Sequence, residues 1–505
     1  KFIRSIIGTK RNVKSNALQF INSLFYDNSG YIWIGTVENG LLKYNPQNDQ
    51  YQHFKFDESD QHSILSNTIE SIYQDKQSNI WIGTDKGLLV YDNKTKKIQR
   101  YTHSPSNPFS LSNDFVITFF EDSNNIMWVG TFTGVNRWDP NMATFRQYST
   151  QTNQELKNNN ITSFAQFIES EIYFSTYSGG IYKMSTITNK ITPVPFNSYF
   201  SDYRIMTLFS DGNTLWVGTR ASGAFAVNIL DNSVKAYRHD ANNLSSLSAN
   251  SVTDIIKDSA GNVWISTFHR GVNRLDSSGN ITRFELNDNF PERGPSSNHV
   301  LQLLEDSNAH IWIATYGGGI SRFNPTDNSF VHIKHNDNDP NSISSDLAWN
   351  VFEDKDKNLW IGTQASGMNI LTKDRIDNEN YQFRQLNGRH GMKSMAVYGI
   401  VQDINDNIWF STSKGISRFS MKNDSFKHFD LTHGLVDLEY THSSVYVGIN
   451  NTIYFGAGKG LSSVNPEEVD VNRIAPDVHL TDILNLNESI TLDTTLSELT
   501  ELNLD

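Results

Sequence analysis

The chain has 505 residues, of which 37% are hydrophobic and 12% aromatic, and it contains no cysteine, which excludes disulfides, thiolate metal sites and thiol nucleophiles. Its 42 Lys and Arg against 55 Asp and Glu give a net charge of −13, which disfavours nucleic acid and anionic membrane surfaces as partners, since both need clustered positive charge. No apolar run is long enough to span a membrane, and neither an initiator methionine nor a signal peptide precedes Lys1. We therefore expect a soluble region of a longer protein, joined to a membrane only through flanking segments.

A tetrad related to Trp-Ile-Gly-Thr recurs along nearly the whole chain at intervals of about 47 residues, and a glycine follows each copy closely. The ten copies begin at Trp33, Trp81, Trp128, Tyr173, Trp216, Trp264, Trp312, Trp360, Trp409 and Tyr454. Repeats of this length are typical of solenoids and propellers, in which one small unit is stacked many times. The pattern predicts one extended array.

The third repeat shows the elements of one unit in chain order. Val116–Glu121 is an apolar run, and after a polar turn the β-rich segment Ile126–Thr131 follows, which is typical of a hairpin. A glycine-containing bend leads to Val135–Trp138, and a further turn precedes an alternating segment that contains Phe145 and Tyr148. Each repeat is predicted to form four short antiparallel strands, called A to D here.

Four-stranded antiparallel sheets repeated in this way match the blades of a β-propeller, which stack face to face around an axis. We therefore predict an all-β fold over residues 1–469, a β-propeller of about ten blades. The aromatic residue that opens each tetrad lies on strand B and is expected to be buried between blades, because a residue present in nearly every blade supports the ring. The tetrads are interpreted as framework.

The two ends of the array suggest how the ring closes. Lys1–Ile7 resembles a D strand with no other strand of its blade before it, whereas the tenth repeat has Val445–Gly448, Thr452–Gly456 and Leu461–Asn465 but no evident D strand. We predict a single ring in which the first segment completes the last blade and removes its free edge. A seven-bladed ring with extra blades is the alternative.

The repeat resembles that of the two-component regulator propeller family. The resemblance is carried by the tetrad with its following Gly-Leu and Tyr-Asp, as in Trp81–Asp92, and by the Asp-x-x-x-Asn-Ile/Leu-Trp lead-in of Asp75–Trp81 and Asp354–Trp360. It extends over about residues 1–469. Beyond it, residues 470–505 contain Pro476–Asn485, which resembles the start of a triple-tyrosine β-sandwich, truncated in this chain.

This resemblance implies a function. Members of the family are periplasmic input regions of membrane-bound sensors, often hybrid histidine kinases, and some detect oligosaccharides. The chain is accordingly expected to be a periplasmic, non-catalytic sensor module for a small molecule or oligosaccharide. A kinase or cyclase output would lie outside the chain, and a homodimer would form through the C-terminal sandwich.

Strand alternation predicts where a ligand binds. The bends between strands B and C and the connections from D to the next A share one side of a propeller, called the upper face here, where variable loops collect. Aromatic rings can stack on sugars, while Arg, His and Gln can reach hydroxyl or carboxylate groups. The candidate binding residues are Phe132, Tyr177, Arg220, Phe268, His269, Arg270, Tyr316 and Gln364 in the B-to-C bends, with Tyr203 and Trp349 in the D-to-A connections.

Other patterns are interpreted as structural. The A-to-B turns are acidic, with Asp122, Asp258, Asp354 and Asp403 at their starts, but none has the closing glutamate of a calcium loop, and turn formation explains them. The histidines lack metal-ligand spacing, and no nucleophile elbow, phosphate loop or dinucleotide fingerprint occurs. We predict no metal, no cofactor and no catalytic residue.

Two further functions remain open. The first is a propeller lyase or hydrolase of acidic polysaccharides, with His269 or His299 as the base and Tyr177 or Tyr316 as the acid. Residues from distant blades can converge in a propeller, so the absence of a local motif does not exclude this enzyme. The second is a protein-interaction platform without a small ligand, which a flat upper face would favour.

Overall fold

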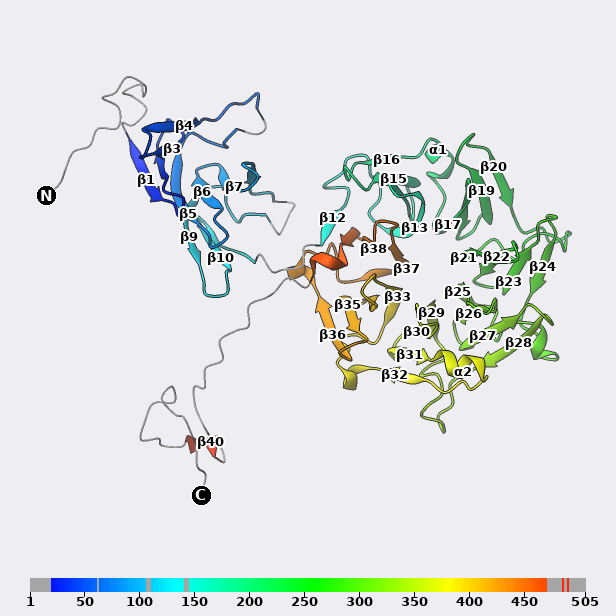
Figure 1. The fold of residues 1–505 in the computed structure, drawn as a ribbon. Helices are drawn as coiled ribbons and strands as arrows, with labels where there is room; N and C mark the ends of the chain where they lie inside the picture. Colours follow the sequence, from blue (N-terminus) through cyan, green and yellow to red (C-terminus); the bar gives the residue numbers. More distant parts are fainter. Residues whose placement is uncertain are drawn as a thin grey trace. The chain divides into compact units, whose positions relative to one another are not determined.

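The computed structural model describes residues 20–60, 63–105, 110–139 and 145–469, together with the short paired strands β40 (Leu484–Asn485) and β41 (Glu488–Ser489). The chain divides into two compact units, one made of residues 1–142 and 471–505 and the other of residues 143–470 (Figure 1). Each unit has hydrophobic core clusters of its own. The predicted start of a sandwich at residues 470–505 lies, apart from β40 and β41, outside the described residues.

The second unit is a ring of seven four-stranded antiparallel sheets (Figure 1). From inner to outer strand the sheets are β13 (Ile161–Ile168), β14 (Glu171–Thr176), β15 (Ile181–Ser185) and β16 (Ile191–Pro193); β17 (Ile205–Asp211), β18 (Thr214–Thr219), β19 (Ala224–Asn228) and β20 (Val234–Tyr237); β21 (Val252–Lys257), β22 (Val263–Thr267), β23 (Val272–Leu275) and β24 (Ile281–Phe284); β25 (Val300–Glu305), β26 (Ile311–Thr315), β27 (Ile320–Asn324) and β28 (Ser329–Ile333); β29 (Ala348–Glu353), β30 (Leu359–Thr363), β31 (Met368–Leu371) and β32 (Arg384–Leu386); β33 (Val397–Gln402), β34 (Asn407–Thr412), β35 (Gly415–Ser420) and β36 (Ser425–Phe429); and β37 (Tyr440–Val447), β38 (Ile453–Ala457), β39 (Gly460–Val464) and β12 (Arg146–Tyr148). Short helices in the connections are α1 (Asn197–Phe200), η2 (Pro291–Arg293), α2 (Lys373–Asp377), η3 (Gly388–His390), η4 (Leu431–His433) and η5 (Pro466–Glu468).

The ring closes through β12, which is the D strand of the third repeat. It pairs antiparallel with β39, so that Arg146 faces Ser463 and Tyr148 faces Leu461. The inner strands pack in a closed series, in which β37 lies against both β33 and β13. The predicted single ten-bladed ring is therefore wrong, and the alternative, a seven-bladed ring with extra blades, describes the molecule. The last blade does take its D strand from an earlier segment, but from the one directly before β13; Lys1–Ile7 lies outside the described residues.

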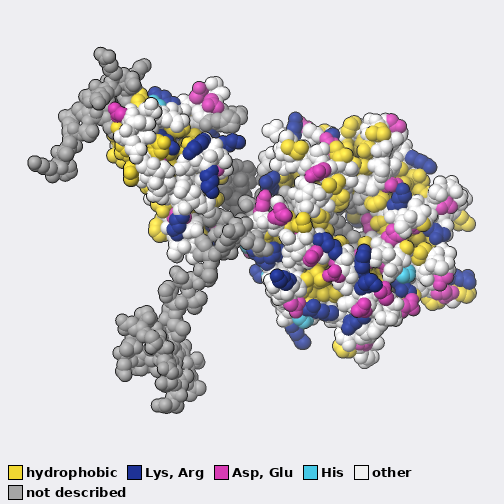
Figure 2. Space-filling view, viewed as in Figure 1, with side chains coloured by type: hydrophobic (Ala, Val, Ile, Leu, Met, Phe, Trp, Pro, Cys, Tyr) yellow, Lys and Arg dark blue, Asp and Glu magenta, His cyan; other side chains and the backbone are white. Residues whose placement is uncertain are grey.

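The first unit holds the remaining three repeats as a row of sheets. The sheets are β1 (Ile21–Tyr26), β2 (Ile32–Thr36), β3 (Leu41–Asn45) and β4 (Gln50–Phe54); β5 (Ile69–Gln74), β6 (Ile80–Thr84), β7 (Gly87–Tyr91) and β8 (Ile98–Tyr101); and β9 (Val116–Glu121), β10 (Met127–Thr131) and β11 (Gly134–Trp138). Large hydrophobic side chains are exposed on the first and last of these sheets, including Leu24 and Phe120, both 63% exposed. Figure 2 shows hydrophobic surface along the edge of the unit where β1 lies.

The tetrad tryptophans form the framework of both units. Seven of them donate their indole Nε1–H to the carboxylate of an Asp six residues earlier, at 2.7–3.0 Å. The pairs are Trp33 with Asp27, Trp81 with Asp75, Trp128 with Asp122, Trp264 with Asp258, Trp312 with Asp306, Trp360 with Asp354, and Trp409 with Asp403. The second carboxylate oxygen of each Asp also accepts backbone N–H groups of its own turn, as Asp354 does from Asn358. The structural interpretation of the acidic turns is thus confirmed, with the indole bond as an added role.

Candidate ligand-binding face

A repeated backbone bond builds the upper face of the ring. In five blades the first residue of the B-to-C bend donates its N–H to the carbonyl of the residue directly before the A strand of the same blade, at 2.8–3.1 Å. The pairs are Tyr177 with Asn160, Arg220 with Arg204, Phe268 with Ser251, Tyr316 with His299, and Gln364 with Leu347. Because only main-chain atoms take part, the two side chains of each pair are free to vary. The bends and connections therefore share one face, as predicted.

One cluster of these side chains joins the first two blades of the ring. The guanidinium of Arg220 donates a hydrogen bond to the Tyr177 hydroxyl at 2.7 Å, and that of Arg204 lies 5.8 Å from the centre of the Tyr177 ring. Both arginines are exposed, while Tyr177 is partly buried. A single aromatic ring thus has two cations beside it, an arrangement suited to a ligand with a flat apolar surface and an anionic substituent.

A second cluster joins the blades that begin with β21 and β25. The Phe268 ring lies 5.2 Å from the His299 ring and 6.5 Å from the Tyr316 ring, and His269 lies 5.7 Å from His299. His269, His299 and Tyr316 are exposed, with 42% of Tyr316 accessible. Three exposed rings and the half-buried Phe268 ring therefore form one aromatic patch at the surface. The neighbouring Arg270 is paired with Glu285 at 3.2 Å, which offsets its charge.

A third group of rings lies on the inner strands. Trp349 stacks on Tyr398 with 5.2 Å between ring centres and 19° between planes, and the His442 ring is T-shaped to Trp349, with 5.4 Å between ring centres. His442 stands in an irregular stretch of β37 where Ser443 has a positive φ of 55°. Its Nε2 is buried and has no hydrogen-bond partner among the described residues, and burial lowers the pKa of the imidazole to about 4. His442 is therefore neutral at neutral pH.

The other sequence-predicted residues do not join these clusters. Tyr203 stacks on Tyr199 and meets Phe225 edge-on at 5.3 Å, so it is part of the packing beneath α1. Gln364 is fixed through its backbone, and Phe132 belongs to the three-sheet unit, where it packs on Phe115.

Sequence reasoning missed Tyr398 and His442. Tyr398 could have been found, because it is the second residue of its A strand, as Trp349 is. His442 could not be found in the same way, because the register of β37 is irregular between Tyr440 and Val445 and the position of His442 in its strand does not follow from the repeat.

Histidines of the D-to-A connections have a structural role. The Nδ1 atoms of His103, His239 and His335 lie 2.6–2.7 Å from the backbone carbonyls of Leu111, Leu247 and Ile343, eight residues further on. No group of three His, Cys, Asp or Glu side chains that could hold a metal ion occurs in the part of the chain that the structure describes. Within the same described ranges, no helix is long and apolar enough to cross a membrane.

Together, the ring of seven four-stranded sheets and the variable side chains on its upper face define the fold of this unit as a β-propeller. Five segments, residues 17–38, 63–86, 110–133, 246–269 and 342–365, match the model of the two component regulator propeller family. These five segments are similar to two component regulator propeller repeats.

Known proteins share part of this sequence or its fold. The chain is 31% identical over 109 residues to Histidine kinase P4 of Formosa agariphila, an alignment that covers 21% of this chain but only 8% of that protein. Among solved structures, the fold is similar to the extracellular domain of a hybrid two component system of B. thetaiotaomicron, with a TM-score of 0.52 and 20% identity over 94% of this chain and 62% of the other. The extracellular domain of a one component system from the same organism matches with a TM-score of 0.50, 20% identity, and coverage of 94% and 60%.

Proposed function

We propose that this chain is the periplasmic ligand-sensing region of a membrane-bound regulator and that its seven-bladed ring binds an oligosaccharide on the upper face. The observation that carries the proposal is the aromatic patch of Phe268, His269, His299 and Tyr316. Exposed aromatic rings on a rigid scaffold provide flat apolar surfaces for the C–H faces of sugars, and the histidines add hydrogen-bond donors and acceptors for hydroxyl groups. The likeness to extracellular domains of sensor systems supports a regulatory role.

The cluster of Tyr177, Arg204 and Arg220 extends this site. It offers a further stacking ring with two exposed cations, so we propose that the preferred oligosaccharide carries a carboxylate or another acidic group. Output through a kinase or cyclase, and a homodimer formed through the C-terminal segment, are parts of the same proposal.

Calorimetric titration of the whole chain with a panel of neutral and acidic oligosaccharides tests the proposal. Phe268→Ala and Tyr316→Ala should each weaken binding of the best ligand at least tenfold, because each removes a stacking surface. Ile404→Ala is the matched control: this side chain is 45% exposed in an A-to-B turn, away from the upper face. Full affinity in both aromatic variants would contradict the assignment of the binding site to the aromatic patch. Absence of binding to every oligosaccharide of the panel would refute the proposed ligand class.

A further inference from the structure

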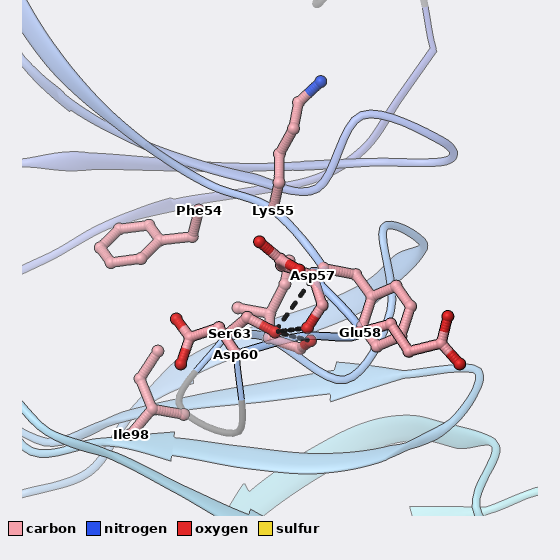
Figure 3. Close-up of a pocket in the computed structure, with 9 residues that line it drawn as sticks. Phe54, Lys55, Asp57, Glu58, Asp60, Ser63 and Ile98 are labelled. Carbon is pink, nitrogen blue, oxygen red and sulfur yellow. Dashed lines mark hydrogen bonds between the residues drawn. The ribbon is translucent and has the colours of Figure 1, made fainter.

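Two surface hollows of about 660 and 600 Å³ occupy equivalent places in the repeat. Each lies between the D-to-A connection of one blade and the D strand of the next. The first is lined by residues of the connection after β4 and by Ile98 of β8 (Figure 3). The second is lined by Pro340 and Asn341 of the connection after β28, and by residues on and around β32.

The two hollows are equivalent because one residue of the same kind of clamp lines each of them, Ser63 in the first and Gln385 in the second. A long side chain on the outer strand donates hydrogen bonds to backbone carbonyls of the preceding connection. The donor and acceptor pairs are Arg100 with Ser63 (2.8 Å), Arg283 with Ser246 (2.9 Å) and Gln385 with Ser342 (2.9 Å). At these three places the clamp ties one blade to its neighbour, so the positions of the two hollows belong to the framework.

The charges around the two hollows are opposite. Figure 3 shows Asp57, Glu58 and Asp60 around the first hollow, with one cation, Lys55. The described residues that line the second hollow include Arg375, Arg384, Arg389 and His390 and contain no carboxylate. Because the fold tolerates either sign at this place, stability of the ring does not require the positive charges of the second hollow.

The positive charges stand on a well-ordered backbone. Asn387 caps η3 by accepting from the backbone N–H of Arg389, and Gly391 ends the turn with a φ of 101°. Phe383, which is 2% exposed, is one of the residues that line the hollow. Residues 384–393 carry four of the basic side chains of a chain with net charge −13, and no Asp or Glu. Arg389 and His390 are exposed at the rim.

Two carboxylates face this group from neighbouring elements. Asp424 pairs with Arg384 at 2.5 Å, and Asp339 accepts from the side-chain amide of Gln382 at 2.9 Å. Arg375 donates to the backbone carbonyl of Gln382. These contacts engage Arg375 and Arg384, whereas Arg389 lies in the capped turn of η3 and is exposed. The hollow keeps an excess of positive charge.

We propose that this basic hollow is a second binding site, which takes a carboxylate or sulfate group of an acidic saccharide. Guanidinium groups match the planar or tetrahedral oxygens of such anions with paired N–H donors. Asn341, Gln385 and Asn387 supply neutral polar groups for sugar hydroxyls, and the volume is that of a small-ligand site. The site lies on the outer strand of its blade, so it does not depend on the aromatic patch of the inner upper face.

Calorimetry with short probes separates the two sites, since a trisaccharide is too short to require both. The probes are a galacturonic acid trisaccharide, a sulfated trisaccharide and a neutral glucose trisaccharide, each titrated into the whole chain. One of the acidic probes should bind. Arg389→Ala should weaken the affinity for that probe about tenfold, and Arg389→Glu should weaken it further. Lys422→Ala is the control and should have no effect, because Lys422 is an exposed lysine in a C-to-D turn. Raising NaCl from 50 to 500 mM should weaken the same binding, because salt screens exposed charges.

Several outcomes overturn the proposal. The proposal is wrong if neither acidic probe binds, or if the neutral probe binds equally well. It is also wrong if the affinity for the acidic probe is unchanged in Arg389→Glu. Loss of binding in Phe268→Ala together with its retention in Arg389→Glu assigns the acidic saccharide to the aromatic face instead. Unchanged melting temperatures of the Arg389 variants exclude misfolding as the cause of lost binding.

Discussion

The bond between the turn aspartate and the tetrad indole predicts a measurable stability cost for removal of a single carboxylate. In the blade of β29 to β32, Asp354 is 2% exposed and Trp360 is 1% exposed. One carboxylate oxygen accepts the indole Nε1–H at 2.8 Å, and the other accepts the backbone N–H of Asn358 at 2.8 Å. Asp354→Ala leaves the indole N–H buried without an acceptor.

The magnitude follows from the two donors. A buried donor without a partner costs about 1–3 kcal/mol; the Asn358 N–H lies nearer solvent and costs less. We expect Asp354→Ala to lower the free energy of unfolding by about 3 kcal/mol. With an unfolding entropy of about 2 cal/mol/K per residue, a ring of this size melting as one unit should lose about 4 °C. Asp354→Asn should lose less, because an amide keeps one acceptor.

Thermal unfolding of the whole chain, followed by tryptophan fluorescence and circular dichroism, measures the effect. Asp356→Ala is the matched control, since it removes an exposed carboxylate from the same turn. Its melting temperature should stay within about 1 °C of the parent chain, as is usual for exposed substitutions. Equal melting temperatures for Asp354→Ala and Asp356→Ala would refute the assignment of the turn aspartates to the framework.

Three further predictions concern pH and ring closure. Burial raises the pKa of Asp254, whose carboxylate accepts the Leu303 N–H at 3.0 Å, to about 6. The unfolded carboxyl ionises near 3.8, so this group lowers stability by roughly 3 kcal/mol in total as pH rises from below 3.8 to above 6. Asp254→Asn should therefore be more stable than the parent at pH 8 but not at pH 4, as measured by urea midpoints. The pKa of His442, lowered to about 4, makes stability depend on pH in the opposite direction. As pH falls below 6.5 the imidazole takes up a proton in the unfolded chain before it does so in the folded chain, and the folded state loses stability. His442→Gln should therefore lessen the loss of stability between pH 6.5 and 4 in the same assay. Tyr148→Ala should destabilise the ring by about 3–5 kcal/mol in denaturant titration, because the 6% exposed ring of β12 packs in the core between the last and first blades; an unchanged midpoint would contradict closure through β12.

The strands of each blade were predictable because every repeat has the same order of apolar strand segments and polar turns. The third repeat was predicted strand by strand, and its first three strands are β9, β10 and β11 as expected. The failure lies in the partner of its D strand, since Arg146–Tyr148 pairs with β39. Outer strands of three to five residues with weak alternation resemble one another, so local sequence does not specify which sheet each one joins.

The candidate site was predictable to the level of the face, but not to the level of contacts. The bends carry Tyr177, Arg220, Phe268 and Tyr316 on the expected side, because strand alternation alone determines that side. Which of these side chains contact one another depends on which blades are neighbours in the ring. The neighbours could be assigned only once the structure showed that the ring closes with seven blades. Tyr203 shows that single residues of the site could not be predicted. It is an aromatic residue in a predicted loop, but it packs against Phe200 of the short helix α1 and against Phe225.

The backbone bond of the upper face explains how the side chains of the bends can differ between blades without loss of stability. At Phe268 the bend is held by its own N–H and the Ser251 carbonyl at 2.9 Å, and the same bond holds Arg220 and Gln364 in other blades. Since an aromatic, a cationic and an amide side chain all occupy the place, its stability depends on the main chain. Phe268→Arg should therefore leave the melting temperature within about 1 °C of the parent while changing ligand preference. A large loss of stability would show that the aromatic patch is packing rather than a binding surface.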